Sequence, residues 1–207
     1  MVKQFIKRNG LLLAWGAVFV AIACGMTKNV ETLQASESKP IEIHEVVINP
    51  QDSVKQELID EVASYMNQNH PNSKVTPDSL VEVCLKHDFD ITFAIAQGTI
   101  ESGMGVAGRA KRTNSVWNVG AYDGKPQPKK FIYQDADSSI EPYVLLVKNK
   151  YLGKLKTLDD LMKNYVALSG HRYAGNRSYE SHLRGVYNRI NKRTRIGELQ
   201  NEYRDMC

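Results

Sequence analysis

Apolar side chains recur at the three- and four-residue spacing of amphipathic helices through most of the chain after residue 52. Residues that cap helices precede these apolar runs at Ser53, Thr76 and Asp90, and the proline after Thr76 suits a first helical position. The pattern therefore predicts three successive helices between residues 53 and 102, with His70-Pro71 ending the first of them.

The same spacing returns in the second half of the chain. It predicts helices over 138–151, from Thr157 onward and from Ser178 onward. Between Trp117 and Tyr133, glycines and prolines stand among aromatic residues, which indicates a loop or a small β-hairpin lobe. We therefore predict a mostly α (α+β) domain over residues 52–207 with one small non-helical lobe.

The first 26 residues differ from the rest. Three basic residues precede an uncharged, mainly apolar run over 11–24, which is shorter than the roughly 20 residues of a membrane span and suits a secretory signal. The run ends in Ala21-Ile22-Ala23-Cys24, which resembles the lipobox of bacterial lipoproteins, where the cysteine is lipidated. An uncleaved signal anchor and simple secretion are the alternatives. All three place the remaining chain outside the cytoplasm, with residues 27–51 as a linker.

Composition narrows the classes of function. Hydrophobic residues make up 42% and charged residues 24% of the chain, which is typical of a soluble globular domain. The net charge of +4 suits an anionic wall polymer, but no basic stripe interleaved with aromatic residues indicates nucleic-acid binding. Cysteines and histidines lack metal-type spacing, so no metal or other cofactor is predicted. In an exported protein Cys84 and Cys207 can pair, and a buried free thiol at Cys84 is the alternative.

One acidic residue stands at the end of a segment without charge. Residues 91–100 are all uncharged and mainly apolar, which indicates a buried helix, and Glu101 follows directly. Apolar surroundings and the negative end of the helix dipole both favour a protonated carboxyl, which a glycosidase needs as its general acid. The alternative is that Glu101 turns outward or pairs with Arg109 or Arg112.

The segment around this glutamate carries a family resemblance. The sequence AQGTIESGMG over 96–105 resembles the A-Q-x-x-x-E-S-G-x-G signature of the peptidoglycan-cleaving glucosaminidases of glycoside hydrolase family 73, which have a lysozyme-like fold. Residues 113–120 resemble a second block of that family, with Asn118 where glycine is usual. Residues 131–143 resemble a third block, and Tyr173-Ala174 with Tyr179 a fourth. The resemblance covers about residues 52–191.

The resemblance implies an endo-β-N-acetylglucosaminidase that cuts the β-1,4 bonds of peptidoglycan glycan strands. It implies that Glu101 is the general acid and that Tyr173 lies beside the cleaved bond. Gln97 is one helical turn before Glu101 and is also a candidate for substrate binding. It either bonds to Glu101 or is a satisfied core residue.

Three more residues are candidates for substrate binding. Asn114 matches the second block of the family. Trp117 and Tyr122 can offer ring faces to sugars, with core packing as the alternative for Trp117.

The second carboxylate of the family pattern is missing. Many members carry another glutamate before the third block, whereas Asp123 is the only acid in residues 122–130 and also suits an ordinary Asp-Gly turn. Asp123 is therefore the candidate second catalytic carboxylate, and a mechanism that relies chiefly on Glu101 stays open. A muramidase or lytic transglycosylase is the alternative activity, and an inactive wall-binding module is the alternative from another class. The predicted location is the cell envelope, with the N-terminal segment in the membrane.

Overall fold

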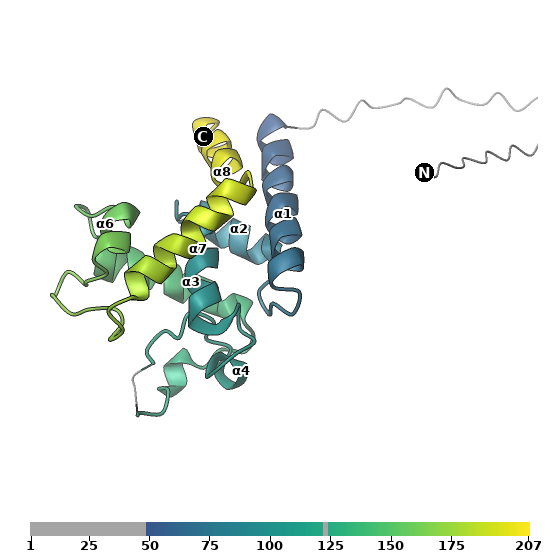
Figure 1. Cartoon of the computed structure of the whole chain (residues 1–207). Coiled ribbons are helices and arrows are strands. Elements are labelled where there is room, and N and C mark those ends of the chain that lie inside the picture. The colour runs from purple at the N-terminus through teal and green to yellow at the C-terminus, as the bar shows by residue number, and fades with distance from the viewer. Residues whose placement is uncertain (1–48, 122–123) are drawn as a thin grey trace, which may run out of the picture. The chain divides into compact units, whose positions relative to one another are not determined.

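The chain folds mainly into helices, as its sequence predicts. The structure is a computed structural model that describes residues 49–121 and 124–207. Within these residues the helices follow one another as Figure 1 shows, and the mostly α fold class is confirmed. The α-helices are α1 (Pro50–Asn69), α2 (Pro77–Lys86), α3 (Ile91–Ser102), α4 (Ala110–Thr113), α5 (Ile140–Leu146), α6 (Leu158–Lys163), α7 (Tyr179–Arg193) and α8 (Ile196–Asp205).

Capping side chains set the starts of the first three helices. The Asp90 side chain accepts a hydrogen bond from the Phe93 backbone N–H at 2.7 Å, and Thr76 caps α2 in the same way. Both predicted caps are therefore confirmed. The predicted cap at Ser53 is wrong because Asn49 caps α1, with Pro50 at the first helical position.

The second half of the chain is less regular than its sequence pattern. The predicted helix over 138–151 forms as α5 between a 3-10 turn, Asp137–Ser139, and a π-helical turn, Val147–Leu152. The helix predicted from Thr157 onward forms as α6, and Thr157 caps it with a capping box. The short α4 and the C-terminal α8 were not predicted.

Helix α3 is the centre of the core. Every residue from 91 to 98 is buried, which confirms the prediction of a buried helix. Helices α2, α7 and α8 pack on α3, while α1 packs on α2 and α8 (Figure 1). Burial of each large side chain of α3, such as Phe93 or Ile95, contributes about 1.5–3 kcal/mol.

The predicted lobe between Trp117 and Tyr133 is a loop and not a hairpin in its described part. Those residues form turns and a 3-10 turn, Lys129–Phe131, and the described part of the chain contains one isolated β-bridge, Val166 to Arg172. Two prolines in the loop cannot donate to a strand ladder. The Gln127 side chain instead donates to the carbonyl oxygens of Val119 at 2.8 Å and Phe131 at 3.1 Å.

The predictions for the N-terminal segment stay predictions. Residues 1–48, with the signal, Cys24 and most of the linker, lie outside the described residues, as do Tyr122 and Asp123. Among the helices that the structure describes, none combines the length and apolarity needed to cross a bilayer.

The two remaining cysteines are free thiols. Cys84 is buried in the core and Cys207 is exposed, so the disulfide alternative is wrong and the buried-thiol alternative for Cys84 holds. Burial raises the pKa of the Cys84 thiol, which makes it a poor nucleophile.

Thiol labelling tests this arrangement. In a full-length chain carrying Cys24→Ser, one thiol should react with Ellman's reagent in the native state and two in denaturant, because only Cys207 is accessible before unfolding. If the denatured, unreduced protein has no reactive thiol, Cys84 and Cys207 form a disulfide.

Candidate active site

Glu101 stands at the last turn of α3, where the chain reverses. Gly103 follows with a left-handed φ of 58°, which ends the helix. The Ser102 hydroxyl donates to the carbonyl oxygen of Val116 at 2.7 Å and accepts from the Gly105 N–H at 2.8 Å. Ser102 therefore fixes the returning loop against the end of α3.

Gly98 lets that loop approach α3 closely. A Cβ atom at Gly98 would lie 2.7 Å from the Met104 Sδ atom and 3.1 Å from the Trp117 Nε1 atom. The indole N–H of Trp117 donates to the carbonyl oxygen of Ala94 on α3 at 2.9 Å. The small residue at position 98 thus allows the segment ending in Trp117 to pack on α3 one turn before Glu101.

Polar donors hold both oxygens of the Glu101 carboxyl group. The Tyr179 hydroxyl donates to Oε1 at 2.6 Å, and the Asn118 amide nitrogen donates to Oε2 at 3.0 Å. Glu101 is partly exposed, so the carboxyl group is oriented by these donors and still accessible from outside. The sequence predicted apolar surroundings for Glu101, whereas its direct contacts include a phenol and an amide.

Asn118 reaches Glu101 from an unusual backbone conformation. Its φ is 50°, in the left-handed region where glycine and asparagine are the favoured residues. The amide nitrogen also donates to the Glu101 carbonyl oxygen at 2.9 Å, which fixes the orientation of the amide because both partners accept. The amide oxygen is buried and has no hydrogen-bond partner among the described residues.

Gln97 acts on Glu101 through Tyr179. Gln97 is fully buried, and its amide nitrogen donates to the Tyr179 hydroxyl at 3.2 Å. Its amide oxygen accepts from the hydroxyls of Tyr143 at 2.8 Å and Tyr165 at 3.0 Å. Gln97 is therefore a positioning residue that directs the Tyr179 proton toward Glu101, and its burial excludes the predicted contact with substrate.

Tyr173 lies next to Tyr179, with the two ring centroids 5.3 Å apart. Its ring stacks on Tyr165 with the centroids 4.4 Å apart, and its hydroxyl donates to the Trp117 carbonyl oxygen at 3.2 Å. The Tyr173 N–H donates to the Tyr165 carbonyl oxygen at 2.8 Å, and the Tyr165 hydroxyl donates to the Gln97 side chain on α3 at 3.0 Å.

Both tyrosines near Glu101 stay protonated. Burial, and after it the negative charge of Glu101, raises the pKa of Tyr173 well above the usual value. Burial likewise raises the pKa of Tyr179, with the charges of Tyr173 and Glu101 adding to the effect. Because both values lie above about 10, the two hydroxyls are hydrogen-bond donors at neutral pH and not bases.

Two predicted substrate-binding residues make contacts within the protein. Trp117 is fully buried and its ring stacks on Tyr143 with the centroids 4.5 Å apart, so no ring face is open to a sugar. Asn114 ends α4, and its amide nitrogen donates to the carbonyl oxygens of Tyr133 at 3.1 Å and Gln134 at 3.0 Å. Tyr122 and Asp123 cannot be placed at the site because they lie outside the described residues.

Other acids downstream of the site are engaged elsewhere. Asp137 accepts from the Thr76 N–H and hydroxyl, each at 2.8 Å, and Asp135 accepts from both donors of Ser138. Glu141 pairs with Lys86 at 2.8 Å and contacts the His87 ring at 2.6 Å. Hydrogen bonds with these partners hold the pKa values of Asp135 and Glu141 below their usual range.

Comparison of the sequence with models of known protein families gives no match, and comparison with curated proteins gives none either. Within residues 49–121 and 124–207, no three His, Cys, Asp or Glu side chains come together as a metal site would require.

Sequence reasoning omitted two residues that contact the Glu101 carboxyl group, Tyr179 and Asn118. A signal existed for each. Tyr179 is the second tyrosine of the fourth resembling block, and Asn118 occupies the position where the family has glycine.

Proposed function

We propose that this chain is a peptidoglycan hydrolase of the endo-β-N-acetylglucosaminidase type, with Glu101 as the general acid. The observation that carries the proposal is the partly exposed Glu101 carboxyl group, held at both oxygens by Tyr179 and Asn118 at the end of a buried helix. The order of the four resembling segments supports the substrate class. Such a hydrolase protonates the oxygen that leaves when the β-1,4 bond breaks.

The hydrogen bonds at Glu101 suit proton donation. Each carboxyl oxygen has two lone pairs, so one donor on each oxygen leaves sites for the catalytic proton. When that proton moves to the leaving oxygen, Glu101 becomes a carboxylate, and the Tyr179 and Asn118 donors stabilise the new charge. These donors are already in position before the reaction, so no reorganisation is required of them.

The product formed from purified peptidoglycan tests the activity. We expect new reducing ends at N-acetylglucosamine, detected by reduction with borohydride and mass spectrometry. New reducing ends at muramic acid would instead identify a muramidase, and anhydro ends a lytic transglycosylase. The absence of any cleavage together with retained binding to peptidoglycan would identify an inactive wall-binding module.

Loss of the Tyr179 hydroxyl should weaken catalysis without unfolding the protein. Tyr179→Phe removes the donor to Glu101 Oε1 and keeps the ring, so turnover should fall by about 10-fold, the effect of one charge-assisted hydrogen bond. The control is Tyr187→Phe on the same helix, whose hydroxyl donates to Asp90 at 3.0 Å and not to Glu101. Equal turnover of the two variants would remove Tyr179 from the site.

We also propose that the protein is held at the outer or periplasmic side of a membrane by a lipid on Cys24. The full-length protein from cells should then partition into the detergent phase of Triton X-114, and Cys24→Ser should move it to the aqueous phase. If the unchanged chain retains the mass of residues 1–23, the segment is an uncleaved signal anchor instead.

A further inference from the structure

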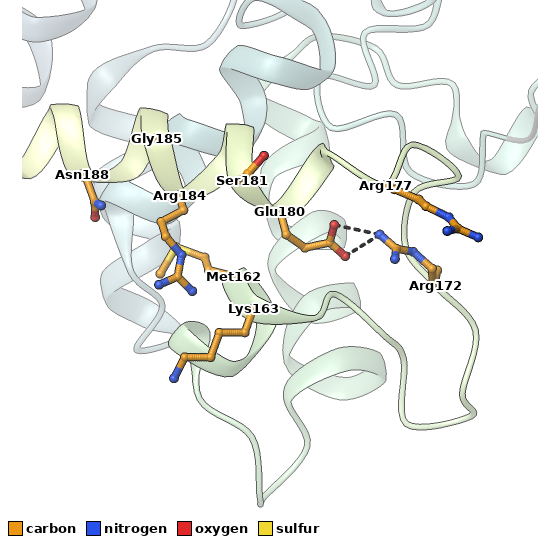
Figure 2. A pocket seen from close by; sticks show the side chains of 9 residues that line it. All are labelled: Met162, Lys163, Arg172, Arg177, Glu180, Ser181, Arg184, Gly185 and Asn188. Carbon is orange, nitrogen blue, oxygen red and sulfur yellow. Dashed lines mark hydrogen bonds and ion pairs between the residues drawn. The ribbon is translucent and has the colours of Figure 1, made fainter.

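A second candidate site lies on the other side of α7 from Glu101. A hollow of about 540 Å³ is lined by residues of α6, α7 and the segment between them, and we call it the α7 pocket (Figure 2). Ser181, Arg184 and Asn188 line it from α7. At 3.6 residues per turn, these three positions lie about half a turn around the helix from Tyr179, which faces Glu101.

The lining of the α7 pocket is mainly cationic. Lys163, Arg172, Arg177 and Arg184 line it together with a single carboxylate, Glu180. Figure 2 shows Arg172 and Arg177 on one side of Glu180 and Lys163 and Arg184 on the other. Arg172 pairs with Glu180, and Lys163 pairs with Asp159 on α6 at 2.5 Å. The positive charge without a close partner therefore comes from Arg177 and Arg184, and an anionic ligand offsets it.

The one carboxylate in the pocket is already neutralised. Both Glu180 oxygens lie within 2.7 Å of the Arg172 guanidinium group, and Oε1 also accepts from the Tyr165 N–H at 3.1 Å. Among the described residues Arg177 forms no ion pair, and Arg184 has only a long one of 3.6 Å to Asp159. Arg177 and Arg184 therefore have donors for a ligand, whereas Arg172 is fixed by Glu180.

One of the residues that line the pocket is a glycine. Gly185 lies inside α7, where glycine is less favourable than alanine. A Cβ atom there would meet no other atom within 4 Å, and Gly185 has no positive φ, so neither packing nor backbone conformation requires a glycine. What the missing side chain provides is space within the pocket.

We propose that the α7 pocket binds the carboxylates of the peptide that hangs from the peptidoglycan glycan strand. The proposal rests on the proposed function, because it places the cleaved sugars at Glu101. The pocket lies across one helix from that point, a width of about 10–12 Å with side chains. An extended peptide covers about 3.3–3.6 Å per residue, so a stem of four residues spans this distance.

The pocket suits a peptide better than a bare phosphate. Arginine side chains bind both carboxylates and phosphates as forks of N–H donors. The hollow, however, has the size of pockets that hold whole small ligands. Met162 and Asn188 add an apolar contact and a hydrogen-bonding amide beside the cations, which suit a peptide chain.

Titration of the peptide alone tests the pocket. The full-length chain is titrated by calorimetry with a synthetic γ-linked stem tetrapeptide with free carboxylates, with the same peptide amidated, and with a glycerol phosphate oligomer. We expect saturable binding of the acidic peptide only. Arg177→Gln and Arg184→Gln should each weaken it about 10-fold, the loss typical of one charge-assisted hydrogen bond. Gly185→Leu should abolish binding because the new side chain takes up space in the pocket, and it should not lower Tm because leucine is a better helix former.

The same titrations include a control variant on α7 outside the pocket. Arg189→Gln makes the same charge change on α7 outside the pocket and should bind the peptide as the unchanged chain does. Absence of peptide binding, equal binding by all variants, or tighter binding of the phosphate oligomer would each overturn the proposal. If the chain binds the peptide through Arg177 and Arg184 but cuts no glycan, the proposed activity is wrong. The assignment of the pocket to the peptide then still holds.

Discussion

Glu101→Gln is expected to abolish the clearing of a peptidoglycan suspension while the protein stays folded. Loss of a general acid reduces turnover by about 10²–10⁴-fold, so the suspension should stay turbid over the time in which the unchanged chain clears it. Glutamine keeps the shape of the side chain. Its amide oxygen can accept from Asn118 and its amide nitrogen can donate to the Tyr179 oxygen, so the hydrogen-bonded site survives. The stability change should therefore stay within about 1 kcal/mol.

Turbidity loss and thermal unfolding of the same samples measure the two effects together. The matched control is Glu198→Gln, which removes an exposed carboxylate on α8 and should leave clearing unchanged. A folded Glu101→Gln protein that clears peptidoglycan at the original rate would exclude Glu101 as the acid, and with it the proposed mechanism.

Local signals in the sequence predicted the helix that carries Glu101. The Asp90 cap, the uncharged run and the glycines after Ser102 gave its start, its burial and its end, because each depends on residues within a few positions. The start of α1 was missed since Asn49-Pro50 lies before the apolar periodicity that marks a helix. The loop of 117–133 resembled a hairpin because turn residues and aromatics occur in both.

Long-range contacts decide the rest of the site, and they were not visible in the sequence. Tyr179 is 78 residues from Glu101 and Asn118 is 17 residues from it, so only the packing of α7 and the loop onto α3 brings them together. Trp117 was predicted at the substrate because an aromatic ring suits both a sugar and a core. Its ring packs on Tyr143 and its indole N–H donates a hydrogen bond to the Ala94 carbonyl oxygen, so Trp117 belongs to the core.

The acids available as a second catalytic carboxylate are few. Asp135, Asp137 and Glu141 each hold a turn, a cap or an ion pair. Asp123 follows Asn118 by five residues in the sequence, and a chain of that length reaches at most about 17 Å. A carboxyl group at roughly 5 Å from Glu101, for a covalent path, or roughly 6–9 Å, for inversion, is within that reach.

Asp123→Asn should then reduce turnover by about 10²–10⁴-fold with little change in stability, because asparagine keeps the turn preference and loses only the charge. The control is Asp205→Asn, an exposed acid near the end of α8, which should keep full turnover. The anomeric configuration of the first product, followed by NMR, separates inversion from retention. A fall of only a few-fold would show that Asp123 is a turn residue. Water activation would then pass to the acetamido group of the substrate, and glycan lacking that group should resist cleavage by the unchanged enzyme.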